Sequence, residues 1–323
     1  MSYVPVIDLS RDPAVVGAEL DEVCTNVGFF QVVGHGVSER VAERAWDAMI
    51  AFFDLPLEER LAVKSQAAGY PYGYIPFSAE SLSKSLGEAS KPDLKEAFSI
   101  GPVDVPTKFQ GEAFQSTPEG WAWQRNLWPE ALPEFREAWT DYFRVMLDLG
   151  ARLMSLFATG LSLPADYFDS SIDESPSSLR ALRYPAHNVG AGDGSLRAGA
   201  HTDYGTVTIL SQDRVGGLEV LTQDEEWAPV ETVRGAFVIN IGDLMARWTN
   251  DRWHSTLHRV IDPEPNSDGE IARRHSMPFF HNTNWDADVS ALPTTVAEGQ
   301  KPRYDAVFAG PHLQSKFTKA TNA

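Results

Sequence analysis

The second half of the chain limits the possible folds most narrowly, because it is a series of short β-type segments separated by turns. These segments are rich in β-branched and aromatic residues and are bounded by glycine, asparagine and aspartate. Many short strands with no helical pattern between them are typical of a β-sandwich, barrel or jelly roll. The expected strands cover residues 179–184, 206–212, 217–221, 227–230, 236–241, 257–261 and 274–280.

The first half mixes strand and helix patterns. Residues 67–90 are rich in Gly, Ser, Tyr and Pro, which predicts a long surface loop. We therefore expect an N-terminal α/β region, residues 1–120, packed on a core formed by residues 121–323 in one compact unit. The expected strands are 4–9, 28–37 and 95–100, and the expected helices are 13–27, 38–53 with Ser38 as N-cap, 128–161 interrupted at Pro133, and 304–318.

Composition and charge exclude several kinds of partner. The chain has 323 residues, 27 basic and 45 acidic, for a net charge of −18. Binding to nucleic acid or an anionic membrane needs clustered Lys and Arg, so neither is expected as a partner. Cys24 is the only cysteine, which rules out an intrachain disulfide and a thiolate metal cluster. No signal-peptide pattern and no membrane-length apolar run is found, so a cytoplasmic protein is expected.

A histidine and a carboxylate lie two residues apart at His201 and Asp203. On a strand, residues i and i+2 share one face, so both side chains are predicted to point to one place. Two imidazoles and one carboxylate hold non-haem Fe(II) and leave coordination positions open. The second imidazole is expected from His258, although His254 would share its face on a short strand, and periodicity alone leaves both open.

A second group of residues suits a small acid. Arg274 and Ser276 share a face of an expected strand, and His275 points to the opposite side. A guanidinium binds carboxylates through two parallel hydrogen bonds and keeps its charge, and the phenol of Tyr184 could reach the same ligand. The alternatives are that Arg274 lies on the surface and that Tyr184 packs in the core, and the spacing excludes neither.

Taken together, these motifs resemble the iron/2-oxoglutarate-dependent oxygenases of the isopenicillin N synthase-like superfamily. Several motifs in one order at matching separations are far more specific than any one of them. The similarity spans nearly the whole chain, through His201-Thr202-Asp203 and residues 216–220, 240–243, 255–260 and 274–280, with 4–9 and 28–36 in the N-terminal half.

The resemblance implies a mainly β fold with flanking helices, built on a double-stranded β-helix (jelly roll or cupin-like) core. It also implies that His201, Asp203 and His258 bind Fe(II). Arg274 and Ser276, supported by Tyr184, would then grip the distal carboxylate of 2-oxoglutarate. The implied reaction uses O2 to oxidise, above all to hydroxylate, a small molecule with release of succinate and CO2.

Substrate identity does not follow from these residues. Residues 67–90 and the segment after Tyr304 could close over the mouth of the site, and a monomer or homodimer is expected. Among the candidates, Arg183 would suit an acidic group on the substrate. The candidate pocket residues, chosen because they lie near the motifs, are Arg183, Tyr204, Phe98, Phe279, Asn282 and Trp285.

Three functional interpretations stay open at this point. The first is a 2-oxoglutarate-dependent hydroxylase. The second is an oxidase that uses no 2-oxoglutarate, in the manner of isopenicillin N synthase or aminocyclopropane carboxylate oxidase; both groups carry an Arg-x-Ser pair. The third is a non-enzymatic β-barrel that binds a small acid, which would leave the three metal-ligand residues without a reason.

Overall fold

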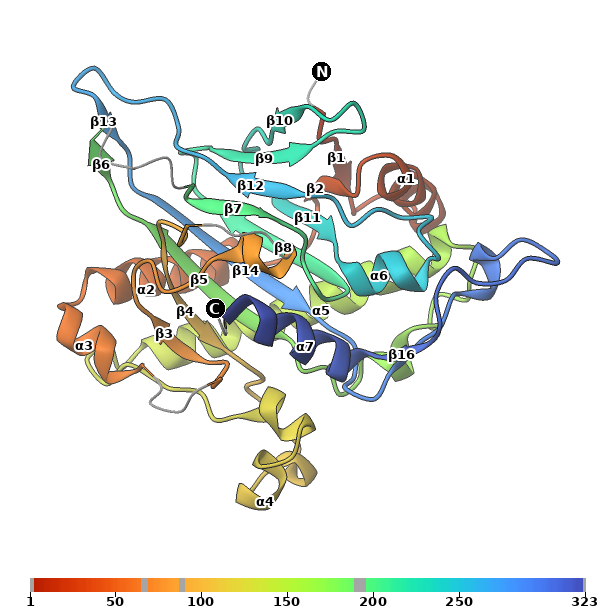
Figure 1. Cartoon of the computed structure of the whole chain (residues 1–323), viewed down its shortest axis with the longest axis horizontal. Coiled ribbons are helices and arrows are strands. Elements are labelled where there is room, and N and C mark those ends of the chain that lie inside the picture. Colours follow the sequence, from red (N-terminus) through yellow and green to blue (C-terminus); the bar gives the residue numbers. More distant parts are fainter. Residues whose placement is uncertain (1–2, 65–68, 87–90, 189–195, 322–323) are drawn as a thin grey trace.

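Two β-sheets enclose a cavity. This computed structural model describes residues 3–64, 69–86, 91–188 and 196–321 (Figure 1). The larger sheet has the strand order β1-β2-β11-β8-β14-β5-β4-β3, and the smaller has the order β10-β9-β12-β7. All neighbouring strands are antiparallel except β1 and β2. Side chains from both sheets line the cavity, so the predicted double-stranded β-helix core is confirmed.

The strands and helices have the following bounds. The larger sheet consists of β1 (Val6–Asp8), β2 (Phe29–Val33), β3 (Gly73–Ile75), β4 (Glu96–Ile100), β5 (Ser178–Tyr184), β8 (Val207–Gln212), β11 (Phe237–Ile241) and β14 (Arg274–His281). The smaller sheet consists of β7 (Ala198–His201), β9 (Leu218–Leu221), β10 (Trp227–Pro229) and β12 (His258–Val260). Two short ladders pair β6 (His187–Asn188) with β13 (Glu270–Ile271) and β15 (Asp288–Val289) with β16 (Val307–Phe308). The α-helices are α1 (Pro13–Asn26), α2 (Glu39–Asp54), α3 (Leu57–Ala62), α4 (Glu112–Gln115), α5 (Phe135–Gly160), α6 (Asp243–Trp248) and α7 (Ala309–Thr321), and the 3-10 helices include η1 (Leu82–Leu86) and η3 (Glu119–Trp123).

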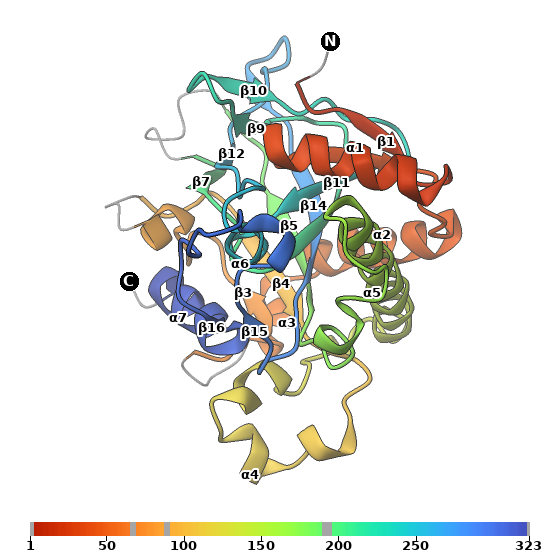
Figure 2. The same ribbon diagram turned by 90° about the vertical axis from the view of Figure 1, so that its right-hand side faces the viewer.

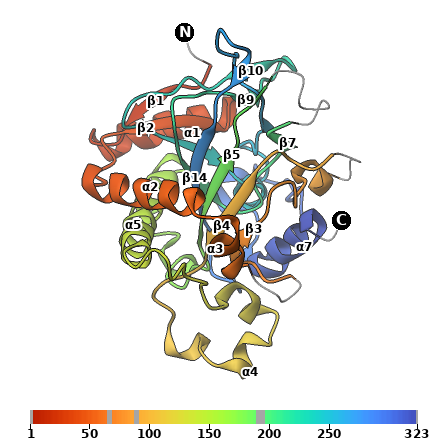
Figure 3. The ribbon, with the colours of Figure 1, turned by 90° about the vertical axis from the view of Figure 1, so that its left-hand side faces the viewer.

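The helices cover the two faces of the larger sheet unequally. Figure 2 shows α1, α2 and α5 on one side of it and α6 and α7 on the other. Figure 3 shows α2 and α3 from the opposite direction, beside β3 and β4, with the α4 segment projecting from the body. The main hydrophobic core lies between the sheet and α1, α2 and α5, and a second core lies between the two sheets. Among the described residues, no helix combines the length and apolar character that crossing a membrane requires.

Strand alternation decides which side chains reach the cavity. Along β14, Arg274, Ser276, Pro278 and Phe280 line the cavity. Phe279 points the other way, into the main core, where its ring lies 5.1 Å from that of Phe143 on α5. Because side chains alternate along a strand, one face of β14 lines the cavity and the other packs against the helices.

Helix α5 approaches the sheet most closely at a glycine. A Cβ atom on Gly150 would lie 2.1 Å from Cδ2 of His281, so only glycine allows this contact. His281 is 1 % exposed, and burial lowers its pKa to about 4. The sheet thus carries a neutral imidazole beneath α5 at pH 7.

We expect His281 to make the protein less stable as the pH falls. Its unfolded pKa is near 6.5 and its folded pKa is about 4, so below pH 6.5 protons bind the unfolded chain preferentially. The free energy of unfolding should fall by about 2 kcal/mol between pH 7 and pH 5 because of this residue. Urea titrations of the wild type and His281→Leu measure the effect, and an identical pH dependence in both proteins would contradict it.

The sequence predicted most of these elements. Each expected strand of the second half is present, with ends shifted by at most a few residues. Three predictions about these elements were wrong. The long helix begins at Phe135, after Pro133, because proline suits a helix start and not its interior. Residues 67–90 are not one loop, because β3 and η1 lie within them; residues 67–68 and 87–90 lie outside the described residues. The β-type half also contains a short helix, α6.

Candidate metal centre and ligand cavity

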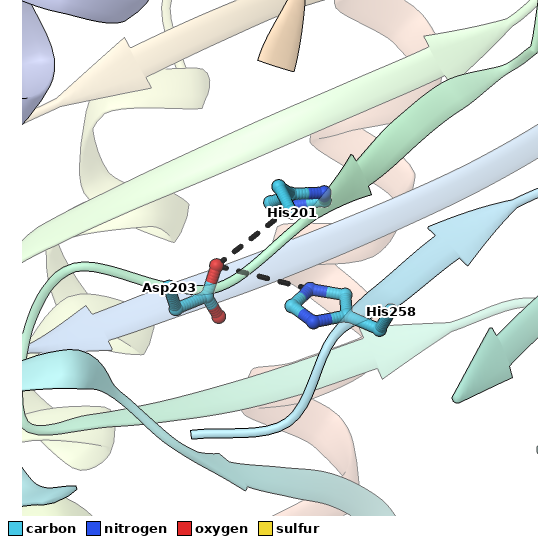
Figure 4. A group of neighbouring side chains, drawn as sticks. All are labelled: His201, Asp203 and His258. Carbon is cyan, nitrogen blue, oxygen red and sulfur yellow. Dashed lines mark ion pairs between the residues drawn. The ribbon is translucent and has the colours of Figure 1, made fainter. Parts of the chain in front are cut away.

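Three predicted ligands meet at one point between the sheets. His201 ends β7 and His258 begins β12, where the two residues are register partners. Oδ1 of Asp203 lies 3.9 Å from Nε2 of His201 and 3.8 Å from Nε2 of His258 (Figure 4). One ligand atom from each residue lies within 4.8 Å of the others. Two ligands of one ion, each about 2 Å from it, lie at most about 4 Å apart, so this donor set fits a single metal.

The shared strand face predicted for His201 and Asp203 is wrong. Strand β7 ends at His201, and Asp203 belongs to the irregular segment before β8. This segment is held by the Asp243 N–H, which donates to the Asp203 carbonyl at 2.7 Å. A Cβ on Gly242 would lie 2.2 Å from the Gly205 carbonyl oxygen, so close backbone packing fixes the turn that brings the carboxylate to the two imidazoles.

Neighbouring groups orient each of the three ligands. Thr208 Oγ1 and Asn240 Nδ2 donate to Oδ2 of Asp203 at 2.5 and 2.7 Å. Nδ1 of His201 lies 2.7 Å from the Gly199 carbonyl, and Nδ1 of His258 lies 3.2 Å from the carbonyl of Thr256. A carbonyl only accepts, so each Nδ1 carries the proton and each Nε2 keeps its lone pair for a metal.

The pKa shifts agree with a metal-binding protonation state. Burial, together with the charge of His258, lowers the pKa of His201 to about 3, so its imidazole is neutral at pH 7. Burial alone would raise the pKa of Asp203. The facing histidines and the hydrogen bonds from Asn240 and Thr208 nevertheless hold it below the usual value. The centre therefore offers two imidazole nitrogens and one carboxylate oxygen as ligand atoms.

Replacing Asn240 with alanine should weaken Fe(II) binding without removing a ligand. The change deletes one of the two donors that orient Asp203, and such orienting partners are typically worth 10- to 100-fold in metal affinity. Fe(II) affinity is measured by anaerobic competition with a chelator, and Asn188→Ala on the exposed β6 serves as the matched control. Unchanged affinity in Asn240→Ala would show that Asp203 needs no such support.

One end of the cavity suits a carboxylate. The cavity has a volume of about 220 Å³, and Arg274, Ser276 and Tyr184 line it. Arg274 is 1 % exposed, and its guanidinium lies 5.1 Å from the centre of the Tyr184 ring. It donates to Ser276 Oγ at 3.2 Å and to the Gln212 side chain at 2.7 Å. Its Nε has no hydrogen-bond partner, and no carboxylate among the described residues pairs with it. A buried cation in this state favours a ligand that carries a carboxylate.

The predicted faces of β14 are confirmed, and the choice between the two histidines is resolved. Arg274 and Ser276 line the cavity, whereas the ring of His275 lies 6.1 Å from that of Phe53 on the helix side. Burial lowers the pKa of His275 to about 4. His254 is exposed and does not belong to the metal-ligand group, which contains His258.

Three of the candidate substrate residues lie elsewhere. Arg183 points to the helix side of β5, where it pairs with Glu96 at 2.5 Å and lies over the ring of Phe53. Phe98 and Phe279 belong to the main hydrophobic core. These positions correct the sequence-based choice, because neighbouring strand residues face opposite sides and Tyr184 already faces the cavity.

The remaining candidates, Tyr204, Asn282 and Trp285, do line the cavity. Sequence reasoning missed two cations of its wall, Lys95 and Arg180. Alternation back from Tyr184 would have found Arg180, because residues 180, 182 and 184 share a face. Both segments expected near the mouth contribute lining residues, namely Pro71, Tyr72 and Leu82 from the first and Leu313 and Phe317 from α7.

The two missed cations are both paired with buried carboxylates. Lys95 Nζ lies 2.6 Å from Oδ2 of Asp93, and both side chains are 3 % exposed. Arg180 donates to the carboxylate of Glu80. Burial would raise the pKa of Glu80, but Arg180 and Lys95 hold it below the usual value, so Glu80 is ionised at pH 7.

Comparisons with known proteins agree with this site. Residues 4–131 match the family model of the non-haem dioxygenase N-terminal region named for morphine synthesis, and residues 176–283 match that of the 2OG-Fe(II) oxygenase superfamily. The chain is 34 % identical over 318 residues to the 2-oxoglutarate-Fe(II) type oxidoreductase hxnY of Emericella nidulans, covering 94 % of this chain and 86 % of that one. This chain belongs to the 2OG-Fe(II) oxygenases.

Further relatives of this oxygenase span its whole length. It is 31 % identical over 332 residues to homoarginine-6-hydroxylase of Oryza sativa, covering 97 % and 96 % of the two chains. A full-length Neurospora crassa protein, solved in complex with α-ketoglutarate and thymine, superimposes with a TM-score of 0.84 at 28 % identity, covering 98 % of this oxygenase and 96 % of that chain. The oxygenase is thus an enzyme that uses Fe(II), O2 and 2-oxoglutarate.

Proposed function

We propose that this oxygenase hydroxylates a small molecule, with His201, Asp203 and His258 as the Fe(II) ligands. The proposal rests on one observation above all. The metal-ligand group and the guanidinium of Arg274, which has no carboxylate partner among the described residues, line the same cavity. Arg274 and Ser276, with Tyr184 beside them, bind the distal carboxylate of 2-oxoglutarate.

Bound Fe(II) and 2-oxoglutarate supply the oxidising power, converting O2 and the keto acid to succinate, CO2 and an oxygen atom for a substrate C–H bond. The residues of this chain supply the geometry. Asn240 and Thr208 hold Asp203 in place, and the apolar walls around Leu210 and Leu218 keep water from the keto acid. Tyr204, Asn282 and Trp285 remain the proposed substrate contacts.

The Arg-x-Ser pair alone leaves a second candidate, an oxidation without 2-oxoglutarate, since the pair occurs in both groups, but the family assignment decides against it. The relatives favour 2-oxoglutarate, because hxnY is named for it and the Neurospora crassa protein was solved with it. They do not fix a substrate: homoarginine and thymine differ in charge and shape.

Anaerobic addition of Fe(II) and then 2-oxoglutarate tests the proposal. A weak visible charge-transfer band should appear only when both are present. In air, a substrate panel should then contain compounds that raise succinate release above its basal rate. Turnover of a substrate without any 2-oxo acid would favour the second candidate, and absence of the band would contradict the ligand assignment.

We further propose a cytoplasmic monomer or homodimer acting on a free metabolite. The support is the acidic composition, with a net charge of −18, and the single buried cysteine. Sedimentation of the purified protein distinguishes a monomer from a homodimer. A larger assembly would contradict the proposal.

A further inference from the structure

Two of the cations that line the cavity are neutralised by carboxylates of the same chain. Lys95 pairs with Asp93, and Arg180 pairs with Glu80, so each of these cations already has a carboxylate partner. The Lys95–Asp93 pair is almost fully buried, and the side chains of Arg180 and Glu80 are 16 % and 10 % exposed. Neither pair therefore leaves a net charge for a ligand to neutralise.

The charged residues of the lining that remain, among those described, are Arg274 and Asp203. On the proposed function, the distal carboxylate of 2-oxoglutarate neutralises Arg274. Asp203 and the second carboxylate neutralise Fe(II), and an imidazole that binds a metal through its lone pair adds no charge. Every charge at the loaded site then has a partner, and an ion entering the remaining space would be buried without one.

Two polar atoms on residues that line the cavity lack hydrogen-bond partners. Asn282 donates from Nδ2 to the Pro176 carbonyl at 3.3 Å, which fixes the orientation of its amide. Its Oδ1 is a buried acceptor without a partner, and Nε of Arg180 is a buried donor without one. Arg180 on β5 and Asn282, just after β14, both line the cavity.

Aromatic side chains complete this part of the cavity. The rings of Trp121 and Trp285 lie 6.4 Å apart, and the ring of Phe317 on α7 lies 5.0 Å from Trp121. All three line the cavity together with Phe280. Such walls favour flat, unsaturated ligands over branched aliphatic ones.

We propose that the substrate of this oxygenase is an uncharged planar molecule with an amide-type N–H and C=O, such as a cyclic or aromatic amide. Its N–H donates to Oδ1 of Asn282, and its carbonyl accepts from Arg180. The electroneutral wall rejects acids and amines of the same shape. This inference rests on the proposed function, because the charges of iron and 2-oxoglutarate enter the balance.

Matched probes test the proposal directly. Benzamide, benzoate and benzamidinium share one ring and differ in charge. Binding is measured without oxygen on enzyme loaded with Fe(II) and 2-oxoglutarate, by calorimetry and by fluorescence of the tryptophans that line the cavity. Benzamide should bind at least about tenfold more tightly than either ion. Equal or tighter binding of an ion, or no binding of benzamide, would overturn the proposal.

Charge-altering variants make the test independent of any one probe. Glu80→Gln leaves Arg180 unpaired and should shift preference toward benzoate by about tenfold or more. Arg180→Gln leaves Glu80 unpaired and should shift it toward benzamidinium. The double variant should return the preference to benzamide. Arg303→Gln, which breaks an exposed pair with Asp251, is the control and should change nothing.

The same samples separate this inference from the proposed function. If the Fe(II)–2-oxoglutarate band forms in all variants but the preferences do not follow charge, the substrate class is wrong and the oxygenase assignment stands. If the band is absent from the wild type, the proposed ligand assignment fails. Melting temperatures identify any variant that has not folded, and the opposite shifts expected for Glu80→Gln and Arg180→Gln cannot arise from a common loss of stability.

Discussion

Replacing Asp203 with alanine is expected to abolish stoichiometric Fe(II) binding and to lower succinate formation at least about 1,000-fold. Asp203 supplies the only carboxylate of the metal-ligand group, and its Oδ1 faces Nε2 of both histidines. The two imidazoles left behind bind Fe(II) weakly, because the ion loses one of its three protein ligands and the only negative charge among them. Bound iron and succinate, measured on the same preparation, test this expectation.

Two further variants show whether the loss is specific to this position. Asp203→Glu keeps the carboxylate but moves it by one methylene, and should retain part of the iron binding. Asp224→Ala removes an exposed acid from the turn between β9 and β10 and should behave as the wild type. Stoichiometric iron in Asp203→Ala would place the metal elsewhere in the protein.

Replacing Arg274 with leucine is expected to weaken 2-oxoglutarate binding by about 100-fold or more. The guanidinium is buried, has no carboxylate partner among the described residues, and has an unpartnered Nε. Charge-assisted hydrogen bonds of this kind contribute about 1.5–3 kcal/mol each. The KM for 2-oxoglutarate and the titration of its visible band both measure the loss.

A comparison of two co-substrates tests whether this loss comes from the contact with the distal carboxylate. 2-Oxovalerate resembles 2-oxoglutarate but lacks the distal carboxylate, so the preference for 2-oxoglutarate over 2-oxovalerate should collapse in Arg274→Leu. Arg274→Lys keeps the charge but not the planar fork and should fall between the two. Arg273→Leu, one residue away, removes a half-exposed arginine that pairs with Asp54 and is the matched control. An undiminished preference in Arg274→Leu would contradict the assignment.

The sequence predicted the core of this site because its chemistry depends on residue types at fixed positions. The motifs identify His201, Asp203, His258 and Arg274, and the structure brings them to one cavity. The common strand face predicted for His201 and Asp203 is nevertheless wrong. The two side chains converge through a turn fixed by Gly205 and Gly242 and not through a common strand.

The elements that were missed have weak local signals. Strand β7 reads Ala-Gly-Ala-His, and alanine and glycine are poor strand formers, so only pairing with β12 defines it. Helix α6 is six residues long, too short for a helical period to show. The division of the chain near residue 120 stays a prediction.

The substrate contacts were the least predictable part, because they depend on register between distant strands. Phe98 lies near the motifs, but β4 pairs with β5 so that Phe98 faces the core. Arg183 and Tyr184 could not both face one cavity, and the structure assigns that face to Tyr184 and Arg180. Proximity along the chain therefore identified candidate substrate residues, but strand pairing determines which of them face the cavity.

Anomalous diffraction at the iron edge, from crystals grown without oxygen in Fe(II) and 2-oxoglutarate, tests the central claim most directly. A single peak is expected about 2 Å from Nε2 of His201, Nε2 of His258 and Oδ1 of Asp203, with the keto acid reaching from it to Arg274. A peak bound by other residues, or no peak between these three side chains, would contradict the proposed metal centre.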